Sequence, residues 1–147
     1  APSKGLRQLE EQTIGREHYA KASWANVGST GIDEADALIA AIAQENQSRA
    51  KIVGTYLVEM RAALSEAVRV LRPGGCFVLV IGANPVCGRR FPSSDYLRLM
   101  LEEMGMTTIL SLVDQIPSRG LMTRRNKTAG IIAAESVIVL RKDACPR

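Results

Sequence analysis

The chain has 147 residues, the size of one ordinary domain, and its 46% apolar and 23% charged residues are typical of a globular protein. Its net charge of +4 is concentrated between Arg119 and Lys127, where four basic residues occur without an acid. A single histidine and three cysteines leave almost no material for a zinc site or a Ser-His-Asp triad. No apolar run approaches the roughly 20 residues of a membrane helix. We therefore expect a cytoplasmic protein with reduced thiols.

The first 30 residues show no sustained periodicity, and we expect an irregular leading segment. Asp33 is a suitable N-cap because its carboxylate can accept the free amides of the next helical turn. Apolar residues at helical spacing from Ala35 to Ala43 then predict a helix. The polar stretch Gln44–Ser48 is expected to bend, break or interrupt it. We interpret residues 31–142 as a single α/β domain, followed by a tail at 143–147.

The clearest element is an amphipathic helix that begins near Lys51, with apolar residues every three or four positions up to Leu71. Pro73 cannot continue a helix, and Gly74 can adopt the left-handed conformation that closes one. Residues Cys76–Ile81 follow as an apolar run without alternation. Such a run predicts a strand buried on both faces.

Three further elements complete the chain. Leu97, Met100, Leu101 and Met104 predict a helix that begins at Ser93 or Ser94 and stops at Gly105. Residues 107–113 predict a strand, a basic loop spans 117–130, and residues 133–140 predict a last strand. The order is therefore helix, helix, strand, helix, strand, strand.

A helix ending in RVLRPGG and running directly into CFVLVIG resembles the helix before the fifth strand, and that strand, in class I S-adenosylmethionine-dependent methyltransferases. In that family the last strand is antiparallel and inserts between the fifth and sixth strands. The resemblance covers about residues 32–142. It implies an α/β, partial Rossmann-like fold with long helices packed on a small mixed sheet and a terminal antiparallel strand.

A finer resemblance rests on LRQLEEQTIGRE, MRAALSEAVRVLRPGG and GIIAAESVIVLRK. These stretches are similar to the back half of DNA and RNA amino-methyltransferases of the Pro-Pro-Tyr type. The resemblance implies S-adenosylmethionine as cofactor and DNA or RNA as partner. It also places Arg16, Glu17 and His18 in a segment that either positions the target loop or forms a capping ion pair.

Two parts of the family pattern are absent from the sequence: the glycine-rich cofactor turn after the first strand and the Pro-Pro-Tyr motif. Gly28–Gly31 reads GSTG, but no strand is predicted before it. The chain is therefore interpreted as a fragment, as a module that pairs with another polypeptide or a second copy, or as a product that lost catalysis. We expect it to be inactive alone, with catalytic and cofactor-binding residues elsewhere, and to self-associate or pair with a missing segment.

The candidate substrate-binding residues are Asn84, Arg119, Arg124, Arg125 and Lys127. The four basic residues could neutralise phosphates, or they could form an ordinary solvated loop. Asn84 follows the predicted strand at the end where open α/β sheets bind ligands, although turn residues are also common there. Trp24, Tyr56 and Tyr96 are expected at or near the core, and Glu135 is expected to pair with a basic neighbour.

Overall fold

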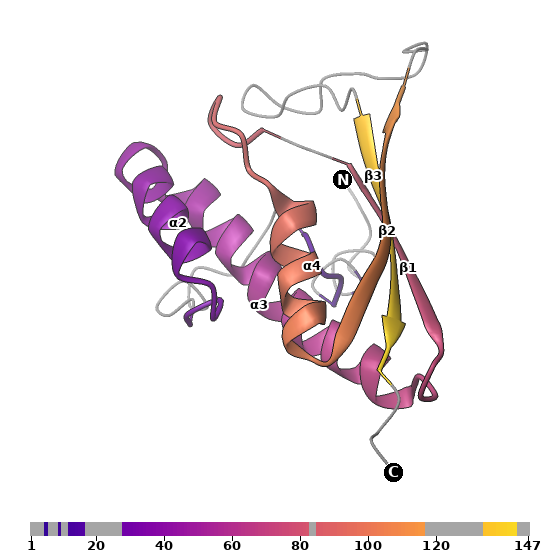
Figure 1. Ribbon diagram of the computed structural model, residues 1–147. Coiled ribbons are helices and arrows are strands. Elements are labelled where there is room, and N and C mark those ends of the chain that lie inside the picture. The colour runs from indigo at the N-terminus through magenta and orange to yellow at the C-terminus, as the bar shows by residue number, and fades with distance from the viewer. Residues whose placement is uncertain are drawn as a thin grey trace. The chain divides into compact units, whose positions relative to one another are not determined.

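The computed structural model describes residues 5, 9, 12–16, 28–82, 85–116 and 134–143 (Figure 1). The chain divides into two compact units, residues 1–62 and 63–147, and the boundary falls within the longest helix. Within the described ranges, no helix combines the length and apolar character that a bilayer span requires.

In the first unit, helix α2 spans Asp33–Glu45. Its N-cap is Ile32 and not Asp33, so the predicted cap is wrong by one residue. The capping role falls to Asp36, because the preceding turn folds back onto its carboxylate. Asp36 accepts the Thr30 amide at 3.0 Å and the Thr30 hydroxyl at 2.7 Å, and the Ser29 hydroxyl donates to it at 2.6 Å.

The polar stretch breaks the helix, which is one of the three outcomes that the sequence left open. Asn46 has an extended conformation between α2 and helix α3, which spans Gln47–Val70. Its side-chain Oδ1 accepts the Arg49 amide at 3.0 Å, which is the geometry of an N-cap. Helix α3 therefore begins four residues before Lys51, because Asn46 satisfies one of its free amides.

A Pro-Gly-Gly turn connects α3 to the sheet and is fixed by the last strand. Gly74 has φ +74°, the left-handed conformation that the sequence predicts. Its amide donates to the Lys142 carbonyl at 2.9 Å, and the Lys142 amide donates to the Gly75 carbonyl at 2.9 Å. The Lys142 side chain continues this contact, since its Nζ donates to the Val68 carbonyl at 2.6 Å and the Leu71 carbonyl at 2.8 Å.

The second unit contains a sheet with strands β1 (Cys76–Gly82), β2 (Met106–Gln115) and β3 (Ala134–Lys142) in the order β1-β3-β2. Strand β3 pairs antiparallel with both neighbours, so β1 and β2 run in the same direction on either side of it. The last strand therefore inserts between the two earlier ones, as the resemblance implies. The register of β2 shifts between Thr108 and Leu110, which leaves Ile109 as a bulge.

Helix α4 (Ser93–Glu103) packs against one face of this sheet (Figure 1). It buries Leu97, Met100 and Leu101, and the sheet buries Ile138 and Leu140. Gly105, which has φ +84°, lies in the short connection between α4 and β2.

The prediction that β1 is buried on both faces is wrong within the described residues. Val78 is 59% exposed and Val80 is 56% exposed, whereas Phe77 and Leu79, which alternate with them, are half-buried. Because α4 covers only one face, the apolar run has a buried side and an exposed side.

Candidate functional site

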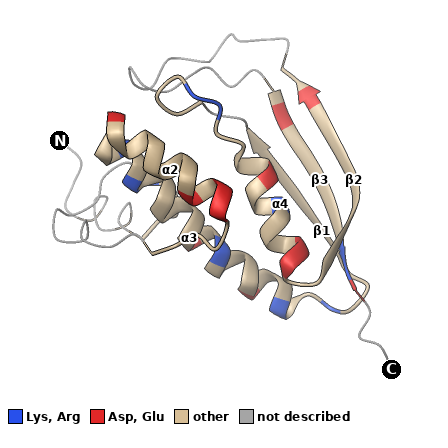
Figure 2. Ribbon diagram, turned by 60° about the vertical axis from the view of Figure 1, so that its left-hand side comes forward, with Lys and Arg blue, Asp and Glu red and all other residues tan. Residues whose placement is uncertain are grey.

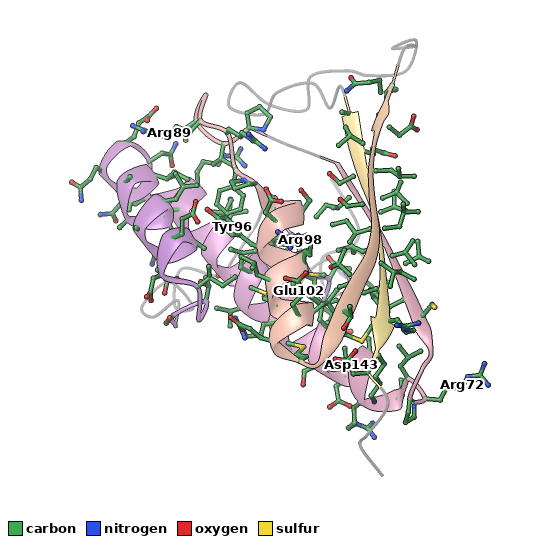
Figure 3. The ribbon with its side chains drawn as sticks, viewed as in Figure 1. Arg72, Arg89, Tyr96, Arg98, Glu102 and Asp143 are labelled. Carbon is green, nitrogen blue, oxygen red and sulfur yellow. The ribbon has the colours of Figure 1, made fainter. Side chains whose placement is uncertain are left out.

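The end of β1 leads into a tight turn that presents basic residues. Val86 and Arg89 exchange two backbone hydrogen bonds of 2.9 Å, and the two residues between them have positive φ, 50° at Cys87 and 71° at Gly88. These are the features of a type I′ turn. The turn places Arg89 and the exposed Arg90 shortly before α4 (Figures 2 and 3).

An aromatic pair anchors the chain that follows this turn. Phe91 and Tyr96 are 3% and 2% exposed, and their rings meet edge to face with centroids 5.6 Å apart. The amides of Asp95 and Tyr96 both donate to the Pro92 carbonyl at 3.1 Å, which starts α4. Tyr96 thus lies in the core, and it fixes the position of the turn relative to the helix.

A chain of part-buried polar side chains connects helix α4 to β2. Arg98 donates to both carboxylate oxygens of Glu102, at 3.0 and 3.1 Å, and the Thr108 hydroxyl donates to Glu102 at 2.7 Å (Figure 3). The turn, the aromatic pair and α4 therefore form one supported segment at the carboxyl end of β1. In open α/β sheets this is the end that faces ligands.

The five candidate substrate-binding residues lie outside the described residues: Asn84, Arg119, Arg124, Arg125 and Lys127. Their assignment stays a prediction. The described basic residues nearest to Asn84 in sequence are Arg89 and Arg90. The sequence gives no signal for the turn that presents this pair, because Cys-Gly is not one of the usual type I′ pairs, such as Asn-Gly, that signal a hairpin.

The segment that resembles the positioning stretch is described at Arg16, whereas Glu17, His18 and Trp24 lie outside the described residues. Arg16 donates to both carboxylate oxygens of Glu59, at 2.8 and 3.1 Å, and to the Thr13 carbonyl at 2.9 Å. The two side chains are only 20% and 27% exposed. This geometry favours the ion-pair alternative, in which Arg16 attaches its turn to α3.

Tyr56 belongs to the same region of the first unit. Burial raises the pKa of its hydroxyl above 10.0, so Tyr56 stays protonated at neutral pH. Its ring lies next to Gly15, where an added Cβ would be 3.6 Å from the ring. This position agrees with the expected place at the margin of a core.

Glu135 does not lie beside a basic side chain in the sheet register. It is opposite Gly82 on one side and opposite Asp114 on the other. The expected basic partner is therefore absent from its neighbours across the strands. Two carboxylates instead occupy adjacent positions at this end of the sheet.

A cradle for S-adenosylmethionine in the GSTG turn would need backbone amides open to a ligand. The Thr30 amide donates to Asp36, and the Gly31 amide donates to the Ser29 hydroxyl at 3.0 Å. The Arg61 guanidinium lies against Gly31, 3.0 Å from the position of an added Cβ, and its Nε donates to the Thr30 carbonyl at 2.8 Å. The Thr30 and Gly31 amides are therefore engaged within the chain, so this turn does not fit the cofactor.

The part of the chain that the structure describes offers few further groups for catalysis or metal binding. Cys76 and Cys87 are free thiols there, and no group of three or more His, Cys, Asp or Glu side chains could hold a metal ion.

No protein-family model matches the sequence, and no curated protein has a significant match. Among solved structures the chain is similar to TTHA0409 from Thermus thermophilus, which carries the provisional name DNA modification methylase. Its complex with S-adenosyl-L-methionine matches with a TM-score of 0.46 and 20% identity over 66% of this chain and 41% of that chain. Its selenomethionine derivative matches with a TM-score of 0.47 and 21% identity over 66% and 40%. The chain thus spans less than half the length of that protein.

Proposed function

We propose that this chain is the C-terminal part of an S-adenosylmethionine-dependent methyltransferase that acts on an amino group of DNA or RNA. The observation that carries the proposal is the strand order β1-β3-β2, with the last strand antiparallel between two strands of the same direction. This order follows a helix and a Pro-Gly-Gly turn whose sequence resembles the same part of that family. The motif and the topology support each other because they concern different segments of the chain.

The role proposed for this part is to build the substrate side of the cleft. The supported turn at Val86–Arg89 lies beyond the carboxyl end of β1, and Arg89 and Arg90 are suited to neutralise phosphates. No described residue is assigned to the cofactor or to the transfer itself. We therefore propose that the chain positions nucleic acid for chemistry performed by residues outside it.

The coding sequence upstream of Ala1 provides the first test. We expect it to encode, in the same reading frame, a glycine-rich turn after a strand and a Pro-Pro-Tyr motif. The protein with its natural flanking segments should then transfer a labelled methyl group to DNA or RNA. A reading frame that holds neither motif would contradict the proposal.

Calorimetry on the 147-residue chain tests the missing cofactor site separately. We expect no measurable heat when S-adenosylmethionine is titrated into this chain alone, because the Thr30 and Gly31 amides of the GSTG turn are engaged within the chain. Tight binding would show that a cofactor site exists within these residues.

A second candidate function is a non-catalytic α/β module that binds nucleic acid or a partner chain through its basic loop. The clustering of four basic residues between Arg119 and Lys127, without an acid, favours it. Affinity for DNA and RNA should fall steeply with salt, and the double variant Arg124→Ala with Arg125→Ala should weaken it.

The matched control for this loop removes the same charge from the end of α3, by Arg69→Ala with Arg72→Ala. Equal affinity in the loop variant and the control would count against loop binding. The two candidate functions then separate by activity, because the module binds nucleic acid without transferring a methyl group even when the flanking segments are present.

A further inference from the structure

An arginine attaches the turn at residues 12–16 to helix α3. Nη1 and Nη2 of Arg16 donate to the two carboxylate oxygens of Glu59, at 3.1 and 2.8 Å. The same guanidinium closes its own turn, because Nη1 also donates to the Thr13 carbonyl at 2.9 Å. One side chain therefore fixes both the shape of the turn and its place on the helix.

A glycine lets the turn lie close to the same part of α3. Gly15 has φ +81°, a left-handed conformation that glycine adopts without steric cost. A Cβ added to Gly15 would lie 3.6 Å from the Tyr56 ring. Tyr56 and Glu59 are three residues apart on α3, so they lie on one face of it. The turn thus meets this face through an ionic contact and an apolar contact.

The geometry of the ion pair is suited to fix an orientation. Two parallel N–H···O bonds between a guanidinium and a carboxylate define a direction that a single bond leaves free. The side chains of Arg16 and Glu59 are 20% and 27% exposed, whereas those of the pair Arg69 and Glu66 are 68% and 66% exposed. Solvent and salt therefore screen the first pair less than the second.

We propose that Arg16 is a positioning residue for methyl transfer, because it holds the chain that leads into this domain in one place on α3. The inference rests on the proposed function, in which the residues that perform the chemistry lie outside the chain and are expected upstream of Ala1. A chain coming from those residues passes through the turn at 12–16 before it reaches α3. A displacement of about 1 Å at reacting groups can lower a rate about 100-fold. Arg16 acts through this placement and not by touching the substrate.

Hydrogen exchange in the 147-residue chain tests the attachment without any methyl transfer. Arg16→Met keeps an unbranched stem and removes the guanidinium, so the amides of residues 12–16 should exchange at least about tenfold faster. The matched control Arg69→Met removes a cation from the exposed pair on the same helix and should leave those amides unchanged. Equal exchange in the Arg16 variant and the unchanged chain overturns the proposal.

Single-turnover kinetics of the protein with its natural flanking segments test the positioning role. The limiting rate constant at saturating enzyme does not depend on the fraction of protein that is folded, whereas the enzyme concentration needed to reach half of it does. Arg16→Met and Glu59→Gln should each lower the limiting rate constant at least about tenfold. The double variant should be no slower than the slower single variant, because each change breaks the same contact.

The outcomes separate this inference from the function on which it rests. If both single variants keep a limiting rate constant within about twofold of the unchanged protein, or if the two losses multiply in the double variant, the positioning role is overturned while methyl transfer stands. An unchanged protein that transfers no methyl group contradicts the proposed function and the positioning role together.

Discussion

Replacing Lys142 with methionine is expected to destabilise the unit formed by residues 63–147. Methionine keeps an unbranched stem of similar length but removes the ammonium group that donates to the Val68 carbonyl at 2.6 Å and the Leu71 carbonyl at 2.8 Å. These carbonyls lie at the C-terminus of α3, where backbone acceptors lack helical partners and a cation is favourable. The variant therefore loses two charge-assisted hydrogen bonds and a favourable interaction with the helix dipole.

The magnitude follows from the partial burial of these bonds. A hydrogen bond to a charged group contributes about 1.5–3 kcal/mol when well protected, and solvent reduces that for a part-buried ammonium, so we expect a total loss of about 2 kcal/mol. With a urea m-value of about 2 kcal/mol per molar, the unfolding midpoint should fall by about 1 M. Unfolding followed by far-ultraviolet circular dichroism measures this shift.

Arg72→Met is the matched control, because it removes a cation from the same end of α3 and Arg72 is exposed (Figure 3). Its effect should stay within about 0.5 kcal/mol. Equal midpoints for the Lys142 and Arg72 variants would refute the assignment of Lys142 as the group that connects β3 to α3.

Two further substitutions probe turns in the two units. Gly75→Ala should lower the free energy of unfolding in urea by about 2 kcal/mol, because the new Cβ would lie 2.8 Å from the Arg72 carbonyl oxygen. The control Gly28→Ala, whose Cβ meets nothing within 4 Å, should be nearly neutral. Equal costs for the two variants would contradict this steric account. Burial alone would raise the pKa of Asp36, but hydrogen bonds from Ser29 and Thr30 lower it below 3.8. The ionised carboxylate therefore stabilises the folded state fully above that pH, and this contribution is lost as the pH falls through the lowered pKa. Asp36→Asn should remove this part of the acid dependence of the urea midpoint, measured from pH 7 downwards, whereas the control Asp33→Asn should not. An unchanged acid profile in the Asp36 variant would refute the role of these hydrogen bonds.

The ends of the helices could be predicted from the sequence because they depend on residues that act locally, whereas α3 begins at Gln47, four residues before the predicted start. Asn46 interrupts the helical period, Gly74 adopts the left-handed conformation, and Gly105 ends the connection after α4. The cap of α2 could not be assigned correctly from the sequence. Asp33 and Asp36 have the same chemistry, and only the fold of the preceding turn selects Asp36.

The candidate site was predictable only in outline. The sequence placed a ligand-facing loop after β1, but nothing in Cys87-Gly88 announced the type I′ turn that presents Arg89. The ion pair of Arg16 with Glu59, 43 residues away, likewise has no local signal in the sequence. Such partners are brought together by packing, which no local pattern encodes.

The sequence by itself determined the order of elements, the Pro-Gly-Gly stop and, through its resemblance, the place of the last strand between the two earlier ones. Those features follow from backbone preferences and apolar spacing over a few residues. The tertiary structure alone decided which side of β1 is buried and that Lys142 connects β3 to a helix 74 residues earlier. The reason is physical: an apolar run requires cover, but the element that covers one face and leaves the other exposed comes from elsewhere in the chain.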